Sequence, residues 1–238
     1  MIHVVSFSGG KDSTCMLLMM LEKGIHIDEI LFCDTGMEFP AMYEHIDKVE
    51  QYIGRKITRL QNPKGFMYYF KEHQKSRGKY MDQLGFGWPN MNLRWCTGVL
   101  KRNVVKTHLR GRTVTEYHGI AYDEPERIKK NAERNIQYPL YDWGITEAMA
   151  LEYCYSKGFD WGGLYRQFRR VSCWCCPLQP LKELYSLYMN YPELWAQLME
   201  MDKYSKYSFK ADYTLTQLEK RFILQKENDE FMEKLRFF

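Results

Sequence analysis

The chain has 238 residues, of which 45% are hydrophobic, enough for one large domain or a domain with a small appendage. Its formal net charge is only +4 at pH 7, so overall charge does not mark it as a nucleic-acid-binding protein. The sequence shows no signal-peptide pattern, and its longest early apolar run, residues 15–21, is far shorter than the roughly 20 residues that cross a bilayer. We therefore expect a cytoplasmic protein without a membrane partner, whose seven cysteines are thiols or metal ligands rather than disulfides.

The first part of the chain alternates between two hydrophobic patterns. Patterns typical of strands cover residues 2–7, 29–33, 56–60 and 113–118, and patterns typical of helices cover residues 13–23, 40–53 and 97–109. Gly24 suits the left-handed cap that ends the first helix. This alternation predicts an α/β fold, a parallel sheet with helices on both faces.

The second part changes character and indicates a helical C-terminal region. Thr146 can cap a helix that ends near Ser156. Residues 159–180 fit neither a helix nor a strand, and helical patterns resume after Pro180 with a break at Pro192. Thr216 and Glu219 have the spacing of a capping box at the start of a last helix. We therefore expect an α/β domain over residues 1–145, with a cysteine-containing segment and a helical region over residues 146–238 packed on it.

The stretch SFSGGKDST, residues 6–14, lies between the first strand and the first helix. A glycine-rich turn at a helix N-terminus presents backbone N–H groups and the positive end of the helix dipole, which together bind phosphate. Gly9 and Gly10 allow the backbone to curl and approach oxygen atoms closely. Lys11 can add positive charge, unless its side chain points to solvent. Asp12 suits either the N–H groups of the loop or a magnesium ion.

This stretch has neither the GxxxxGK[ST] spacing of the Walker loop nor the GxGxxG of dinucleotide-binding folds. It resembles the SGGxDS signature of the PP-loop ATP pyrophosphatases, which split ATP between the α- and β-phosphates and adenylate a substrate. The resemblance implies a Rossmann-like (adenine nucleotide alpha hydrolase-like) domain, ATP and Mg²⁺ as ligands, and Lys11, Asp12 and Ser13 as catalytic residues.

Further motifs resemble the phosphoadenosine phosphosulfate (PAPS) reductase family. They are DTGMEFP at residues 34–40, RWCT with Leu100 and Lys101, GIAYDEPER at residues 119–127, and PLYDW at residues 139–143. Ala121 stands where this family often has an arginine. The resemblance covers residues 2 to about 180. It implies nucleotide-binding residues that we list as Ser6, Ser8, Gly9, Gly10, Lys11, Asp12, Ser13, Asp34, Thr35, Gly36, Lys101, Gly119 and Arg127.

Four cysteines form a candidate metal site. Cys173 and Cys176 are in a CxxC spacing that can direct two thiolates at one metal, and a proline follows, as at iron–sulfur sites. Cys96, at the head of a predicted helix, is the natural third ligand, and Cys175 or a non-protein ligand is the fourth. In the resembled family, many members hold a 4Fe-4S cluster with cysteines at these two places; Zn²⁺ bound by thiolates and free thiols are the alternatives. We expect Cys15, Cys33 and Cys154 to be core residues.

The sequence favours ATP over PAPS as the substrate. In the resembled family, the sulfonucleotide reductases attack the substrate sulfur with a cysteine on a C-terminal tail and tend to lose part of SGGxDS. This sequence keeps SGGKDS whole and has no cysteine after Cys176. We therefore expect an ATP pyrophosphatase that adenylates an acceptor for sulfur transfer, with a sulfonucleotide (PAPS/APS) reductase and a non-catalytic nucleotide-binding partner as the alternatives. The sequence is compatible with an oligomer.

The acceptor that we expect is a nucleic acid, as in DNA phosphorothioation systems, whose PAPS reductase-like subunits the chain resembles, or in tRNA thiolation. A sulfur-donor protein is the expected partner. Residues 161–170 intersperse aromatic residues with arginines, namely Trp161, Tyr165, Arg166, Phe168, Arg169 and Arg170. This composition suits base stacking and phosphate binding, and it equally suits packing around the metal site.

Overall fold

A computed structural model describes residues 1–76, 81–128 and 135–235 of the chain. It contains a five-stranded sheet in the order β3-β2-β1-β4-β5, whose neighbouring strands pair in parallel. The strands are β1 (Ile2–Ser6), β2 (Glu29–Asp34), β3 (Thr58–Gln61), β4 (Val114–His118) and β5 (Asn135–Gln137). The predicted α/β fold is therefore confirmed.

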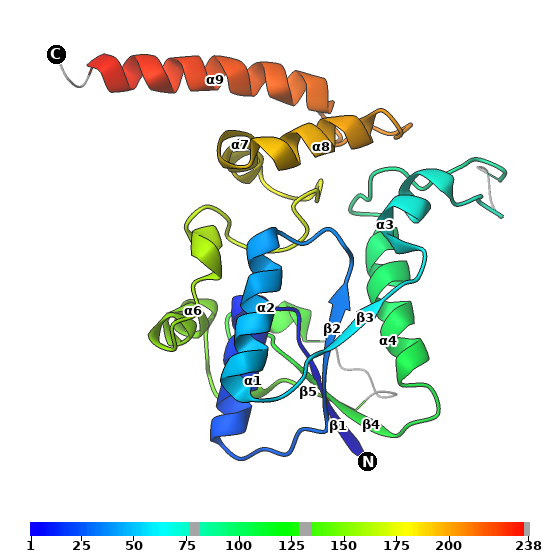
Figure 1. Cartoon of the computed structure of the whole chain (residues 1–238), viewed down its shortest axis with the longest axis vertical. Coiled ribbons are helices and arrows are strands. Elements are labelled where there is room, and N and C mark those ends of the chain that lie inside the picture. Colours follow the sequence, from blue (N-terminus) through cyan, green and yellow to red (C-terminus); the bar gives the residue numbers. More distant parts are fainter. Residues whose placement is uncertain (77–80, 129–134, 236–238) are drawn as a thin grey trace. The chain divides into compact units, whose positions relative to one another are not determined.

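Helices cover both faces of this sheet. The connections β1–α1–β2 and β2–α2–β3 step across the sheet in one direction, and right-handed crossovers place α1 (Lys11–Glu22) and α2 (Pro40–Ile53) on one face. The chain then returns past β1 to β4 through the π-helix η2 (Thr97–Arg102) and α4 (Asn103–His108). Figure 1 shows α1 and α2 on one side of the strands and α4 on the other.

Local sequence signals explain where these helices begin and end. Helix α1 ends as expected at Gly24, whose φ is +66° and whose N–H donates to the carbonyl of Leu21. Helix α2 has Pro40 at its first position and Gly54 in the left-handed conformation just after it, so its predicted bounds are confirmed. The predicted helix over residues 97–109 begins instead as the π-helix η2.

By its contacts the chain divides into two compact units: unit 1 contains residues 1–63 and 97–173, and unit 2 contains residues 64–96 and 174–238. This division differs from the expected boundary at residue 145. Helix α6 (Glu147–Ser156) belongs to unit 1 because it packs against α1, and the thiol of Cys154 lies 3.4 Å from the carbonyl of Lys11. Thr146 caps α6 as predicted, since its hydroxyl accepts the N–H of Met149.

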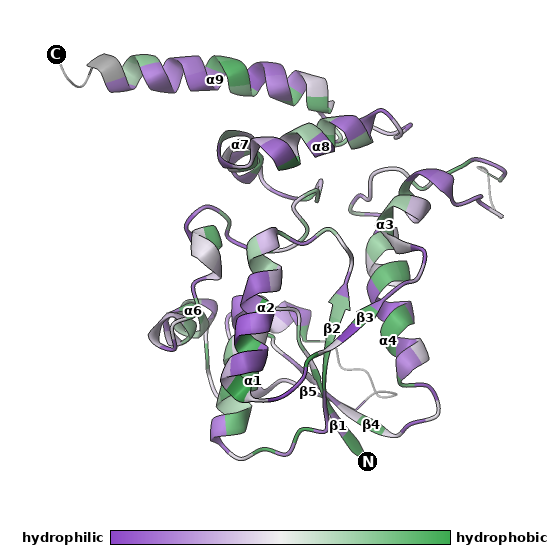
Figure 2. Cartoon of the chain, in the orientation of Figure 1, coloured by the Kyte–Doolittle hydropathy of each residue, from purple (hydrophilic) through white to green (hydrophobic). Residues whose placement is uncertain are grey.

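The core of unit 1 lies between the sheet and its helices. The buried strand residues include Val4, Val5, Phe7, Ile30, Leu31 and Phe32, and the buried residues of α1 include Cys15, Met16, Leu17 and Met20. Figure 2 shows apolar colour along β1 and β2. Unit 1 also contains η3 (Pro125–Arg127), α5 (Pro139–Asp142) and the 3-10 helix η4 (Trp161–Arg166).

Unit 2 is helical. Its elements are α3 (Gly65–Met67), η1 (Tyr68–Glu72), α7 (Leu181–Asn190), α8 (Pro192–Asp202) and α9 (Leu215–Leu235). Trp88, Trp195, Phe209 and Phe222 are among its buried side chains. The prediction of a capping box at Thr216 was wrong by two residues: the N–H of Gln217 donates to the Thr214 hydroxyl, and the N–H of Thr214 donates to the Gln217 side chain.

Within the described ranges, we find no helix with the length and apolar character needed to cross a membrane.

Candidate functional site

The loop that joins β1 to α1 lies at the carboxyl edge of the sheet, beside the point where the strand order reverses. Such a reversal between β1 and β4 is where ligands bind in open α/β sheets. Ser6 and Ser8 are exposed here, and Gly10 immediately precedes α1. The loop predicted to bind phosphate therefore lies at the position where ligands bind in folds of this type.

The two glycines of this loop have different conformations. Gly9 has φ +79°, and a Cβ on it would lie 2.5 Å from the Met42 sulfur. Gly10 has φ −76°, a conformation open to any residue, and a Cβ there would meet the Tyr165 hydroxyl at 3.2 Å. The left-handed curl thus depends on Gly9, while Gly10, without a side chain, leaves room for the Tyr165 hydroxyl at the helix N-terminus.

Hydroxyl groups fix the shape of the loop. The Ser13 hydroxyl accepts the N–H of Ser8 at 3.1 Å, donates to the carbonyl of Gly10 at 3.0 Å, and lies 3.0 Å from the Ser8 hydroxyl. Gly119, directly after β4, packs against this turn, because a Cβ on it would lie 2.9 Å from the Cα and N of Ser13. The predicted residues Ser8, Ser13 and Gly119 therefore lie together.

Residues 154–165 hold the same loop from outside. The Trp161 indole donates to the carbonyl of Gly9 at 2.7 Å, and the N–H of Lys11 donates to the Tyr165 hydroxyl at 2.8 Å. His45, fully buried, stacks on Trp161 with ring centroids 4.3 Å apart. Burial lowers the pKa of His45 to about 3, so this imidazole is neutral near pH 7.

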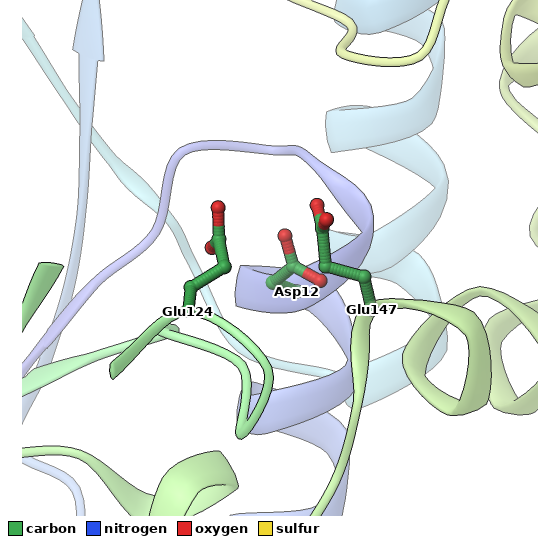
Figure 3. Close-up of side chains that lie close together, drawn as sticks. All are labelled: Asp12, Glu124 and Glu147. Carbon is green, nitrogen blue, oxygen red and sulfur yellow. The ribbon is translucent and has the colours of Figure 1, made fainter. Parts of the chain in front are cut away.

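The Lys11 side chain does not point to solvent. It is 8% exposed, and its ammonium lies 2.7 Å from a Glu147 oxygen and 3.1 Å from both Asp12 oxygens. Glu124 lies nearby, and carboxylate oxygens of Asp12, Glu124 and Glu147 lie within 4.8 Å of one another. Figure 3 shows these three side chains converging from α1, from the loop after β4 and from the start of α6. We call these three residues the acidic trio.

Lys11 affects the two carboxylates that it contacts differently. Burial raises the pKa of Asp12 above its ordinary value, against the opposing charge and hydrogen bond of Lys11. Burial also acts to raise the pKa of Glu147, but the hydrogen bond and charge of Lys11, with the charges of Arg170 and Arg169, lower it below the ordinary value. Lys11 therefore favours the ionised form of Glu147, whereas at Asp12 the effect of burial is the larger one.

Arginines surround the acidic trio on its exposed side. Glu124, whose side chain is 5% exposed, accepts hydrogen bonds from Arg127 and, at 2.5 Å, from Arg170. Arg169 lies 3.6 Å from Glu147. These three arginine side chains are between 41% and 75% exposed. They can therefore leave a carboxylate and bind an anionic ligand without being moved out of a buried position. Arg127, predicted as a nucleotide-binding residue, thus lies beside the acidic trio.

A second group of predicted residues follows β2. The Asp34 carboxylate accepts the N–H of Gly36 at 2.8 Å, the Tyr43 hydroxyl at 2.8 Å and the Gln61 amide at 2.5 Å. Thr35 is buried, and its hydroxyl donates to Glu38, which lies 3.7 Å from the Lys101 ammonium. Asp34, Thr35, Gly36 and Lys101 therefore lie together, and the Asp34 carboxylate is bound by its own turn, by α2 and by β3.

The cysteines predicted as metal ligands are divided between the units. Cys173 ends unit 1, where its sulfur lies 3.4 Å from the Thr35 hydroxyl and 3.6 Å from Glu38. Cys96, Cys175 and Cys176 belong to unit 2. Burial raises the pKa of Cys176, and the neighbouring Cys96 raises it further. In the described part of the chain, the acidic trio is the group found to offer three possible metal ligands, and the cysteine site stays a prediction.

The other cysteines mostly follow expectation. Cys15 and Cys154 are fully buried, and burial raises the pKa of Cys15 to about 12, so both are core thiols as predicted. Cys33 is only partly buried, and its thiol lies 3.8 Å from the carbonyl of Lys101.

Two of the three predicted aromatic residues among residues 161–170 are buried. Trp161 and Phe168 are each 1% exposed, and Phe168 packs on Phe39 with ring centroids 4.9 Å apart. Base stacking by these two rings is therefore excluded, because they are buried behind the loop and α2. Arg166, Arg169 and Arg170 are exposed.

Sequence reasoning missed two members of the acidic trio. Glu124 lies within the GIAYDEPER motif, which was a usable signal, although the motif suggested Arg127 and Gly119 instead. Glu147 follows the helix cap Thr146, where an acidic residue normally indicates only a favourable helix start. Nothing in its local sequence distinguishes a site residue from a capping residue.

The comparison with known families agrees with this geometry. Residues 2–179 match the phosphoadenosine phosphosulfate reductase domain, so the chain belongs to that family. The match covers the sheet, the loop after β1 and the acidic trio.

Curated relatives are similar over most of the chain. Two are from Methanocaldococcus jannaschii: uncharacterized protein MJ0066 is 29% identical over 81% of the chain, and uncharacterized protein MJ0973 is 30% identical over 83%. An uncharacterized nin region protein, ORF290, of Escherichia phage lambda is 29% identical over 63% of the chain. The chain spans 39%, 47% and 58% of the lengths of these three relatives, respectively.

Proposed function

We propose that this PAPS reductase-family protein is an ATP pyrophosphatase that adenylates an acceptor for sulfur transfer. The observation that carries the proposal is the loop at residues 8–13, which brings a helix N-terminus, the Lys11 ammonium and the acidic trio together at the strand-order reversal. Backbone N–H groups and positive charge suit a polyphosphate, and nearby carboxylates suit the metal ion that accompanies it.

The reaction that we propose is a displacement at the α-phosphorus. An acceptor oxygen forms a bond to that phosphorus, the bond from the α-phosphorus to the oxygen bridging to the β-phosphate breaks, and pyrophosphate leaves with the electron pair. The loop N–H groups and Lys11 stabilise charge on the leaving pyrophosphate. Ser13 holds the loop in shape through its bonds to Ser8 and Gly10.

The donor set of the acidic trio fits Mg²⁺. Three carboxylates within 4.8 Å of one another offer the oxygen ligands that this ion prefers, and Asp12 and Glu147 are partly exposed. Asp12, Glu124 and Glu147 would hold the ion, which supplies charge neutralisation for the leaving group when bound. The Lys11 ammonium would then be released from the carboxylates toward phosphate.

We place the adenosine at the end of β2, against Thr35 and Gly36. Gly36 is exposed, has φ +75° and has nothing within 4 Å of the position of a Cβ, so this turn leaves room for a ligand. Asp34 supports the site by holding the N–H of Gly36. Lys101, paired with Glu38, adds a positive charge near this turn.

We further propose a nucleic acid as the acceptor, in modification of the DNA phosphorothioation or tRNA thiolation type, with a sulfur-donor protein as partner. Support comes from the exposed arginines 166, 169 and 170, two of which border the acidic trio. A 4Fe-4S cluster on Cys96, Cys173, Cys175 and Cys176, or Zn²⁺ on the same thiolates, is part of this proposal; the soft sulfur donors suit either.

Pyrophosphate release tests the proposed activity. Purified protein is incubated with ATP and Mg²⁺, with and without DNA or tRNA, and pyrophosphate is measured. We expect release that is lost in Gly10→Val, because the valine side chain covers the helix N-terminus while its backbone conformation is allowed. Gly98→Val is the matched control, since a Cβ on Gly98 meets only an Arg102 nitrogen, at 4.0 Å.

Two results would replace the proposal by an alternative. Sulfite release from PAPS, with no pyrophosphate from ATP, would make the protein a sulfonucleotide reductase. ATP binding that is lost in Gly10→Val, with no turnover in the presence of any acceptor, would make it a non-catalytic nucleotide-binding partner.

A further inference from the structure

Two aromatic residues of η4 contact the loop after β1, and their polar groups are used differently. Trp161 is 1% exposed, and its single N–H is donated to the carbonyl of Gly9 at 2.7 Å. Tyr165 is partly exposed, and its hydroxyl accepts the N–H of Lys11 at 2.8 Å. Among the contacts of the described residues, the Tyr165 hydroxyl makes no hydrogen bond as a donor. Its proton therefore remains available.

The position of this hydroxyl favours donation to an anion. Lys11 is the first residue of α1, so its N–H is one of the groups at the helix N-terminus without a partner inside the helix. An oxygen that accepts such an N–H sits at the positive end of the helix dipole, and its own O–H becomes a stronger donor through polarisation. The hydroxyl also lies over Gly10, 3.2 Å from where a Cβ would be.

We propose that Tyr165 is a phosphate-binding residue of the nucleotide site, whose hydroxyl accepts the Lys11 N–H and donates its proton to a phosphate oxygen of ATP. This inference rests on the proposed function, and it adds to the loop a neutral donor from a distant part of the chain. The Tyr165 hydroxyl would thus lie between the Lys11 N–H and the phosphate. The phosphate would bind further from the helix N-terminus than if it accepted the Lys11 N–H directly.

Two further observations support a binding role over a purely structural one. The Tyr165 ring is already held in place by edge-to-face packing on Trp161, with ring centroids 4.8 Å apart, so its hydroxyl is not needed to anchor the side chain. Burial raises the pKa of Tyr165, which keeps the hydroxyl protonated across the neutral range.

Tyr165→Phe tests the proposal, because it removes the hydroxyl and keeps the ring. Binding of ATP, inorganic pyrophosphate and adenosine is measured by titration calorimetry, with urea unfolding alongside. We expect ATP and pyrophosphate to bind about fivefold to tenfold more weakly and adenosine to bind unchanged. Trp161→Phe is the matched control, because it removes a hydrogen bond between η4 and the loop. It should lower the free energy of unfolding and should change the affinities for ATP and adenosine by the same factor.

The outcomes separate this inference from the proposed function. Wild-type protein that binds ATP, together with a Tyr165→Phe variant that binds ATP and pyrophosphate equally well, overturns the inference alone. Tighter binding by Tyr165→Phe also overturns it, because the hydroxyl would then block phosphate. If Tyr165→Phe lowers the affinities for ATP and adenosine equally, the proposal is overturned and Tyr165 has only a structural role. Wild-type protein that binds neither ATP nor pyrophosphate overturns the proposed function and the inference together.

Discussion

The loop after β1 and the turn after β2 occupy equivalent places in the fold but use their polar groups in opposite ways. Each follows the carboxyl end of a parallel strand and leads into a helix, α1 or α2. In the turn after β2, the Asp34 carboxylate is bound by three donors of its own neighbourhood. In the loop after β1, the charged groups of Lys11 and Asp12 meet the distant Glu147 and Glu124. The Asp34 carboxylate thus joins its turn to α2 and β3 through hydrogen bonds, and the loop after β1 assembles a charged site.

Lys11→Met tests this comparison with the largest expected effect. The Lys11 side chain is 8% exposed and that of Glu147 is 18% exposed, so the substitution leaves partly buried carboxylates without their counter-charge. We expect the free energy of unfolding at pH 7 to fall by about 3–5 kcal/mol. Urea unfolding measures the change.

The double variant Lys11→Met with Glu147→Gln is the control for that prediction. It removes one of the uncompensated charges and should recover about 1 kcal/mol or more of the loss. A loss below about 1 kcal/mol in Lys11→Met alone would contradict the prediction. It would mean that solvent screens the Lys11–Glu147 ion pair as it screens a surface salt bridge.

A matched pair of glycine substitutions compares the backbones of the two segments. Gly9 and Gly36 have similar positive φ values, +79° and +75°. A Cβ on Gly9 would lie 2.5 Å from the buried Met42 sulfur, whereas a Cβ on Gly36 meets nothing within 4 Å. We expect Gly36→Ala to lower the free energy of unfolding by about 1–2 kcal/mol through strain alone, and Gly9→Ala by about 2–4 kcal/mol because overpacking adds.

Thermal or urea unfolding of both glycine variants measures this difference. Equal losses would mean that Met42 moves aside freely. A Gly9→Ala, Met42→Ala double variant whose Gly9 cost falls to that of Gly36→Ala would assign the excess to the Met42 contact.

Asp34→Ala tests the hydrogen bonds that hold the turn after β2. Removing the carboxylate leaves the Gly36 N–H, the Tyr43 hydroxyl and the Gln61 amide without this acceptor. We expect the free energy of unfolding to fall by about 1.5–3 kcal/mol, with a smaller effect on ATP affinity than Gly10→Val has. Tyr43→Phe, which removes one of the three donors, should cost less. A large loss of ATP affinity at unchanged stability would instead make Asp34 a direct nucleotide ligand.

The fold could be predicted from the sequence where strong local signals agree with the overall architecture. Alternating patterns identified four of the strands, and Pro40 and Gly54 fixed both ends of α2. Strand β5 was missed because three residues are too few to show a period. The start of α9 was misplaced because Thr214-Gln217 and Thr216-Glu219 both fit a capping box, and only hydrogen bonds distinguish them.

The candidate site could be predicted only where its residues are adjacent in the chain. The loop from Ser8 to Ser13 is one such motif, and its position in the fold agrees with the prediction. Glu147 comes to Lys11 through the packing of α6 on α1, and Tyr165 through a 3-10 helix in a segment whose pattern fits no regular structure. Contacts of this kind depend on tertiary packing, which produces no repeating pattern of residues in the sequence.

The division into two units has a consequence for how the chain is synthesised. Residues 64–96 leave the ribosome long before residues 174–238, which complete their unit. Until then Trp88 lacks Phe209, on which it packs with ring centroids 5.0 Å apart, and it lacks the Asp202 carboxylate that accepts its indole N–H at 2.6 Å. This aromatic segment is therefore exposed during translation, when proteases and chaperones can reach it. Unit 1 has a shorter delay, because 33 residues (64–96) separate its two segments, whereas 77 residues (97–173) separate those of unit 2.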